Sequence, residues 1–328
     1  MKPAPALALL AILALAPLPS NAQAVGSTAP FTLSMSPQYA TPGGSVTLTP
    51  LSSTMNLANA TLAIFVNGKQ VYSGNVAPTQ VTVGPAGAVT TIKASVTSGG
   101  ATYSQTLSII PQDVSLIIEP IASAPALYAG KPPVPLEGAV RLIAVASFET
   151  GTGKATDPSA LSYSWTVDGA KDPSLSGIGK NAVTVASPLQ YRRRTVSVAI
   201  ENADRSLAGG ASLSFSAQNP SVRLYEDDPL LGIRFDSALA GSYHMPASEA
   251  ALFAAPFGFP ISTGAPSMEW FLNGAAAQAG PVITLRPTGS GQGSASLTFS
   301  AKGGLYTTAA QALTVTYGAS SNSGLFGL

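Results

Sequence analysis

The segment YSWTVDG at residues 163–169 determines how the whole chain is interpreted, because it occurs in three versions. The other two are AIFVNG at residues 63–68 and MEWFLNG at residues 268–274, and the closing glycines lie 101 and 105 residues apart. In each version an alternating apolar stretch ends in Asn-Gly or Asp-Gly, the strongest short-range signal of a β-hairpin with a type I′ turn. The repeat therefore predicts three similar structural units, each built around one such hairpin.

Each hairpin supplies a predicted turn and a predicted core residue. The turns are expected at Asn67-Gly68, Asp168-Gly169 and Asn273-Gly274. An aromatic side chain precedes each turn by two or three positions, and we expect Phe65, Trp165 and Trp270 to point into the three cores.

The remaining sequence has the patterning of short antiparallel strands. Small polar and β-branched residues alternate at residues 45–49, 195–200 and 295–299, which is typical of strands with one buried and one wet face. The best helical stretch, Ala247 to Phe253, is short and lies between Pro246 and Pro256. An all-β chain with about seven short strands per hundred residues indicates immunoglobulin-like sandwiches.

The repeats divide the chain into a tandem array of three immunoglobulin-like β-sandwich domains after a cleaved signal peptide. We place the domains at residues 25–112, 113–217 and 218–318, followed by a flexible tail with an apolar end at residues 319–328. The last strand of one domain runs almost directly into the first strand of the next. Such short linkers predict a semi-rigid rod.

The middle unit resembles the PKD and related bacterial Ig-like domains of exported surface proteins. The resemblance rests on YSWTVDG at residues 163–169 and VSVAIEN at residues 196–202. It extends less closely to the other two units, the first of which lacks a tryptophan. The resemblance implies a sandwich fold, a role in spacing or adhesion, and no catalytic residues.

Residues 1–24 have the layout of a secretory signal peptide. Lys2 precedes an apolar run, and Ala22-Gln23-Ala24 forms a small-x-small cleavage site, so we expect the mature chain to begin at Val25. The run is shorter than the roughly 20 residues that a membrane anchor needs. We expect an exported protein, located outside the cell, at its surface or in the periplasm, with no membrane insertion.

The composition excludes several classes of function. Charged residues make up 9% of the chain, the formal net charge is +1, and there are no cysteines and one histidine. The first two values argue against a nucleic-acid partner, and the lack of cysteine excludes disulfides and thiolate metal sites. The only histidine, His244, has Ser242 and Asp236 nearby, but no nucleophile elbow is present. We therefore predict no catalytic residues and no cofactor.

Two charged segments remain as candidate binding sites. One segment is acidic and lies at an expected domain entry, as does a further acid: it comprises Glu226, Asp227 and Asp228, and the further acid is Glu119. These carboxylates could bind calcium. The favoured interpretation is that they protect strand edges. Residues 192–194 are three consecutive arginines, which could hold an anionic glycan or phosphate or could simply form a solvated loop.

Together these features predict a non-catalytic structural or adhesive protein at a bacterial cell surface or in an extracellular appendage. Its partner would be a protein or glycan at that surface. One alternative is a carbohydrate-binding accessory module of a secreted enzyme system. The other is a polymerising subunit that exchanges its N-terminal strand, Phe31 to Met35, or the tail at residues 319–328.

Overall fold

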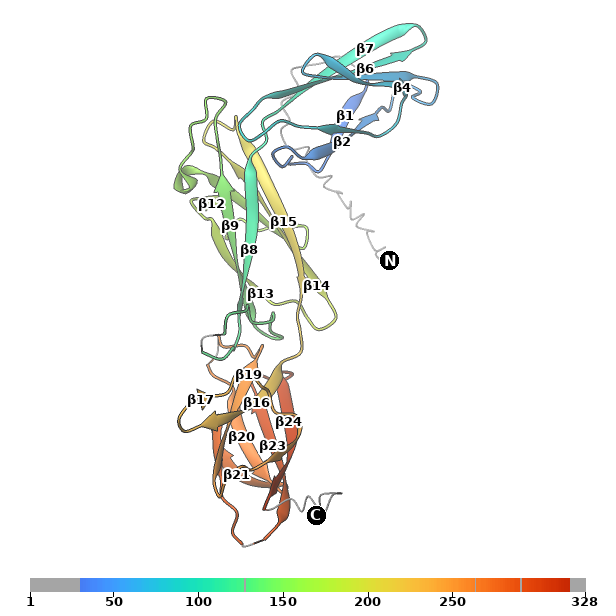
Figure 1. Ribbon diagram of the computed structural model, residues 1–328. Helices are drawn as coiled ribbons and strands as arrows, with labels where there is room; N and C mark the ends of the chain where they lie inside the picture. Colours follow the sequence, from blue (N-terminus) through green and yellow to red (C-terminus); the bar gives the residue numbers. More distant parts are fainter. Residues whose placement is uncertain (1–29, 127, 263, 290, 319–328) are drawn as a thin grey trace, which may run out of the picture. The chain divides into compact units, whose positions relative to one another are not determined.

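The computed structural model describes residues 30–126, 128–262, 264–289 and 291–318 (Figure 1). These residues form strands and one short 3₁₀-helix, Pro158–Ala160, and no helix among them is long and apolar enough to cross a membrane. The chain divides into two compact units, one ending at Pro111 and one beginning at Gln112. The first unit contains one β-sandwich and the second contains two, which we call the second and third sandwiches. The expected signal peptide and tail lie outside the described residues.

The first sandwich has the two-sheet arrangement of an Ig-like domain. One sheet has the order β1-β2-β5 and the other the order β4-β3-β6-β7. The strands are β1 (Thr32–Ser36), β2 (Ser45–Leu51), β3 (Thr61–Val66), β4 (Lys69–Asn75), β5 (Thr79–Thr82), β6 (Thr90–Ser98) and β7 (Ala101–Ile109). Alternate residues of β2, β3 and β6 are buried, and they form the core that the period-two pattern predicts.

The second sandwich repeats this strand order. One sheet has the order β13-β9-β8 and the other the order β11-β10-β14-β15, with β12 paired to β10. The strands are β8 (Asp113–Ile121), β9 (Ala139–Ser147), β10 (Ser162–Val167), β11 (Ala170–Lys171), β12 (Gly177–Ile178), β13 (Ala182–Ala186), β14 (Arg193–Glu201) and β15 (Ala208–Ser216). Trp165 is fully buried, and its indole N–H donates to the Lys180 carbonyl at 2.8 Å.

The third sandwich contains an insertion between its first two long strands. Its sheets have the orders β17-β16-β19-β22 and β18-β24-β23-β20-β21. The strands are β16 (Ser221–Asp228), β17 (Gly232–Ile233), β18 (Gly241–His244), β19 (Ala250–Phe257), β20 (Ser267–Leu272), β21 (Ala275–Ala279), β22 (Val282–Leu285), β23 (Gly293–Lys302) and β24 (Thr308–Tyr317). Strand β18 comes from the insertion and pairs in parallel with β24.

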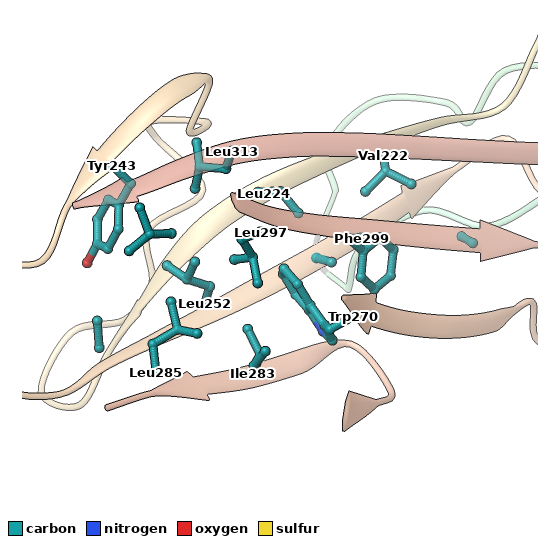
Figure 2. Packing of buried hydrophobic residues seen from close by; sticks show 14 of the residues in the cluster. Val222, Leu224, Tyr243, Leu252, Trp270, Ile283, Leu285, Leu297, Phe299 and Leu313 are labelled. Carbon is teal, nitrogen blue, oxygen red and sulfur yellow. The ribbon is translucent and has the colours of Figure 1, made fainter. Parts of the chain in front are cut away.

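The core of the third sandwich is built around Trp270. Figure 2 shows its indole beside the ring of Phe299, with aliphatic side chains from both sheets on either side. The two rings meet edge to face, with centroids 4.8 Å apart. The indole nitrogen of Trp270 is buried and, among the described residues, has no hydrogen-bond partner. The equivalent tryptophans of the second and third sandwiches therefore differ in one hydrogen bond.

One predicted core residue is wrong. Phe65 is only half-buried, whereas the preceding residue, Ile64, is fully buried in the first core. Ile64 lies three positions before its turn, as Trp165 and Trp270 do, and both tryptophans are fully buried. Because side chains alternate between the two faces of a strand, the neighbouring position must face away from the core. An aromatic residue at the adjacent position led to the wrong assignment.

The second half of the segment with the best helical pattern, residues 250–253, lies in a strand. Residues 250–257 form β19, which pairs with β16 on one side and β22 on the other. Leu252 and Ala254 point into the main core, while Ala255 and Phe257 pack with Tyr225 in a second cluster on the opposite face. A strand buried on both faces lacks period-two alternation, so its sequence cannot be distinguished by periodicity from a short buried helix.

Candidate functional site

The three hairpin turns share one hydrogen-bonded arrangement. Asn67, Asp168 and Asn273 all have φ of 50°, and the glycines that follow have φ of 82–84°, as a type I′ turn requires. In the second sandwich, the carboxylate of Asp168 accepts from the Thr195 backbone N–H at 2.8 Å, and the Asp168 N–H donates to the Thr195 carbonyl at 2.8 Å.

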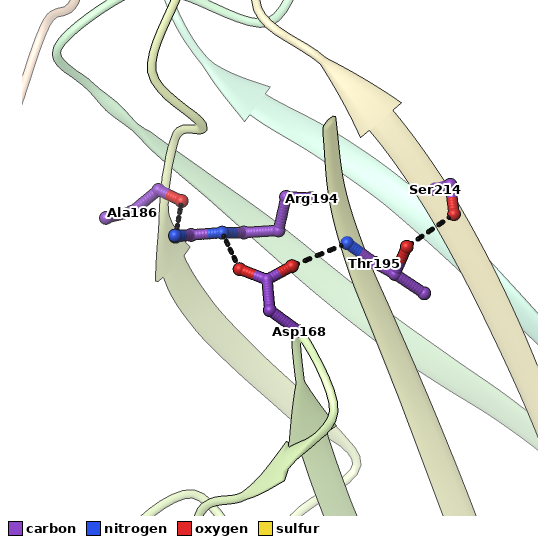
Figure 3. A network of polar contacts seen from close by, with 5 residues as sticks. All are labelled: Asp168, Ala186, Arg194, Thr195 and Ser214. Atoms are coloured by element: carbon purple, nitrogen blue, oxygen red, sulfur yellow. Dashed lines mark hydrogen bonds and ion pairs between the residues drawn. The ribbon is translucent and has the colours of Figure 1, made fainter. Parts of the chain in front are cut away.

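The second sandwich adds a side-chain network to this turn. Figure 3 shows Arg194 reaching the other oxygen of Asp168, at 3.0 Å, and the Ala186 carbonyl, while the hydroxyl of Thr195 meets that of Ser214 at 2.7 Å. Arg194 thus links β14 to the opposite sheet at the end of β13. The arginine run is therefore divided in function: Arg194 is structural, whereas Arg192 and Arg193 are exposed.

The residues considered for a catalytic triad have separate partners. His244 lies on β18, exposed, and its Nδ1 is 3.2 Å from the hydroxyl of Thr316. Asp236 accepts from the guanidinium of Arg234 at 3.2 Å, which lowers the pKa of that carboxyl. No hydrogen bond joins His244 to Asp236 or Ser242 within the described part of the chain.

The acidic run in the third sandwich makes hydrogen bonds within the protein. Glu226 accepts from the hydroxyl of Tyr243 at 3.0 Å. Asp228 accepts from the backbone N–H groups of Leu230 and Leu231 at 2.8 and 2.9 Å, which lowers the pKa of its carboxyl. In the described ranges no three or more acidic or histidine side chains lie together as a metal site would require. The arrangement supports a turn-stabilising role for Asp228 and a link from Glu226 to β18.

Hydrogen bonds between loops distant in sequence join the second and third sandwiches. Ser123, just after β8, donates its N–H to the Phe259 carbonyl at 2.8 Å and accepts from the Gly258 N–H at 3.0 Å. Its hydroxyl oxygen accepts from the Phe259 N–H at 3.0 Å, and Ala122 forms an antiparallel bridge with Pro260. Phe259 is fully buried in the core of the third sandwich, so this short pairing connects the second sandwich to a residue of that core.

A carboxylate makes a second connection at the same junction. Glu137 lies in the second sandwich, and its Oε2 accepts from the Tyr306 N–H at 2.9 Å and from the Thr307 hydroxyl at 3.4 Å. Its φ of 52° is in the left-handed region, which is uncommon for a glutamate. Gly304 leaves room for the Glu137 carboxylate, because a Cβ at position 304 would lie only 2.6 Å from Glu137 Oε2.

No separate sequence signal marks these junction residues. Ser123, Glu137 and Phe259 belong to no repeat, and each has its role only because the fold brings together loops more than 130 residues apart. Apart from the proline-rich stretch at residues 131–135, nothing in the local sequence marks the region. Beside this junction is a groove of about 430 Å³ lined by both sandwiches.

Comparisons with known proteins name no family. No protein-family model and no curated protein matches the chain. Among solved structures, the chain is similar to the central fibronectin-III array of RIM-binding protein, with 10% identity over 90% of this chain and 99% of that one at a TM-score of 0.30.

Two further structures show comparable similarity. One comprises the three N-terminal domains of the bacteriophage RB49 highly immunogenic outer capsid protein, with 13% identity over 88% of this chain and 99% of that one at a TM-score of 0.25. The other comprises fibronectin(III)-like modules of Clostridium thermocellum CbhA, with 15% identity over 57% of this chain and 94% of that one at a TM-score of 0.22. Similarity at this level supports no functional argument. The fold assignment rests on the strand order and pairing of this chain, which is a tandem array of Ig-like β-sandwiches.

Proposed function

We propose that the protein is a non-catalytic structural or adhesive component of a bacterial cell surface or extracellular appendage. In this proposal it is related to the PKD-type surface domains that the middle sandwich resembles. Its Ig-like domains act as a semi-rigid rod that holds a recognition surface at a fixed distance and orientation. The partner is a protein or glycan at that surface.

The observation that carries the proposal is the hydrogen-bonded junction at Ser123. A flexible tether would need no contacts between neighbouring domains, whereas here the backbone and side chain of Ser123 both bond to the segment at Gly258 and Phe259. Glu137 adds a carboxylate that accepts two further hydrogen bonds. Charge-assisted hydrogen bonds contribute about 1.5–3 kcal/mol and neutral ones about 1 kcal/mol. A junction of this kind favours transmission of orientation from one domain to the next.

Exchange of the N-terminal strand is a weaker candidate than the spacer function. The N-terminal strand that would be exchanged, Phe31 to Met35, is largely within β1, which pairs with β2 through five consecutive residues. Phe31 is buried in the first core. Polymerisation through this strand would first have to break those contacts. Size-exclusion chromatography tests the choice, since a spacer elutes as a monomer and a polymerising subunit as a ladder.

Expression of the entire sequence in a bacterial host tests the export that this function needs. The proposal predicts that the protein is recovered outside the cytoplasm with Val25 as its first residue by intact-mass spectrometry. A matched variant with a charged residue in the apolar run, Leu10→Arg, should remain unprocessed in the cytoplasm. Recovery of the unvaried chain in the cytoplasm with its first 24 residues intact would contradict the proposal.

A further inference from the structure

The groove beside the junction of the second and third sandwiches is concave and lined by both. Its volume of about 430 Å³ lies within the roughly 300–1,000 Å³ of small-molecule sites. One wall consists of Ile118, Pro120, Tyr128 and residues 131–134, and Ser221, Arg223 and Phe257 supply much of the other. A site shared between two domains is a common place for a ligand to bind.

The groove carries positive charge without a neutralising carboxylate. Lys131 and Arg223 both line it, and no acidic side chain is among its described lining residues. Glu119 is the nearest acidic residue along β8, next to Ile118, which lines the groove. Because side chains alternate between the two faces of a strand, Glu119 points away from the face of Ile118. Its carboxylate pairs with Arg141 at 3.6 Å. Two cations that share a concave surface favour an anionic ligand.

The guanidinium of Arg223 is held in position before any ligand arrives. Its central carbon lies 5.3 Å from the centroid of the Phe257 ring. Tyr128 meets the same ring edge to face at 5.3 Å and is itself 46% exposed. A planar guanidinium fixed on an aromatic face keeps its hydrogen-bonding edge free and loses little entropy when it binds a carboxylate. Lys131 is oriented too, because its Nζ donates to the Ile118 carbonyl at 3.3 Å.

The walls suit a sugar better than an extended peptide. Pro120, Pro132 and Pro133 line the groove, and because proline has no backbone N–H, they cannot pair with an added strand. Gln218, with a side-chain amide, and Ser221, with a hydroxyl, also line the groove. Amide and hydroxyl groups beside a partly exposed tyrosine ring can serve the hydroxyls and the apolar C–H face of a pyranose ring.

We propose that this groove binds a uronate residue of an acidic polysaccharide, with Arg223 and Lys131 holding the carboxylate and Tyr128 contacting the sugar ring. The inference rests on the proposed adhesive function and assigns its ligand class. It also gives the rigid junction a purpose, because the site exists only while the two sandwiches keep their relative position.

Isothermal titration calorimetry of the chain from Val25 onward, with tetragalacturonate and tetramannuronate as probes, tests the proposal. We expect at least one of the two to bind, and the methyl ester of that probe, which lacks the charge, to bind at least tenfold more weakly. Arg223→Gln and Lys131→Gln should each weaken binding about tenfold, because each removes one charge-assisted contact. Circular dichroism melting curves check that the variants remain folded.

The double variant Arg192→Gln/Arg193→Gln is the matched control. It removes the same charge as Lys131→Gln/Arg223→Gln, but from two exposed positions at the start of β14, and should leave binding unchanged. Equal losses in the two double variants would overturn the proposal in favour of diffuse charge attraction. Binding of poly-glutamate without binding of either oligosaccharide would overturn it in favour of an acidic peptide, and binding of no probe would overturn it outright. None of these outcomes changes the domain spacing, which is measured separately.

Discussion

Asp168 and Thr195 exchange two hydrogen bonds, one through the carboxylate and one through the backbone N–H of Asp168, both at 2.8 Å. Asn67 makes the same pair of bonds with Thr91, and Asn273 makes them with Ser296. The turn residue of each hairpin thus fastens the turn to a neighbouring strand. This explains why the repeat retains Asn or Asp at this position, since only a short side chain with an oxygen acceptor fits both the left-handed backbone and the strand's N–H.

Replacing a turn residue should therefore destabilise one sandwich. Asn273→Ala removes the acceptor for the Ser296 N–H and leaves the left-handed backbone at φ of 50° without the side-chain hydrogen bond that stabilises it, so we expect a loss of about 1–3 kcal/mol. Asn273→Asp keeps the acceptor, as Asp168 does, and should stay within about 0.5 kcal/mol of the unvaried chain. Hydrogen exchange of the β20 and β23 amides measures both. Equal protection in the alanine variant and the unvaried chain would show that the bond is dispensable.

The two buried tryptophans should respond differently to the same substitution. Trp165→Phe leaves the Lys180 carbonyl without its indole donor, whereas Trp270→Phe removes an indole N–H that has no partner among the described residues. Both variants lose similar apolar volume. We expect Trp165→Phe to cost about 1 kcal/mol more, because it breaks a part-buried hydrogen bond to the Lys180 carbonyl. Urea denaturation, with hydrogen exchange resolving each sandwich, makes the comparison. A larger cost for Trp270→Phe would contradict this account.

Tyr243 should make the third sandwich sensitive to alkali. Burial of its ring, and secondly the hydrogen bond to Glu226, raise the pKa of Tyr243 well above the ordinary value near 10. The folded state therefore keeps the phenol protonated at a pH where the unfolded chain ionises. Its contribution is complete below about pH 10 and is lost as the pH rises from there toward the folded pKa.

Urea midpoints between pH 8 and pH 11.5 measure this dependence. Tyr243→Phe should flatten the alkaline decline of the third sandwich, although it lowers stability at pH 8 by loss of the bond to Glu226. Tyr306, which is 77% exposed, provides the matched control, and Tyr306→Phe should leave the decline unchanged. An identical alkaline decline in all three proteins would exclude Tyr243 as its source.

Local patterns were sufficient to predict the architecture but not the junction. The turn at Asp168-Gly169 and the alternating strand before it are contiguous in sequence, so their structure could be predicted from a few residues. The prediction for Phe65 is wrong because it accepts an aromatic residue either two or three positions before the turn as the core residue. In all three hairpins the buried residue lies three positions before the turn. Ser123 and Glu137 gain their roles from loops 136 and 169 residues away. Local sequence propensities cannot predict hydrogen bonds between residues so far apart in the chain.

The proposed spacer function requires that the second and third sandwiches keep a fixed relative orientation. Single-molecule energy transfer between dyes at exposed positions of the two, Tyr191→Cys and Leu305→Cys, measures this directly, since the chain has no native cysteine. The account predicts one narrow distance distribution for the unvaried junction. It predicts a broader one for Ser123→Gly/Glu137→Ala, which removes the carboxylate and the serine hydroxyl from the contact. A broad distribution in the unvaried junction, unaltered by the double substitution, would contradict the account.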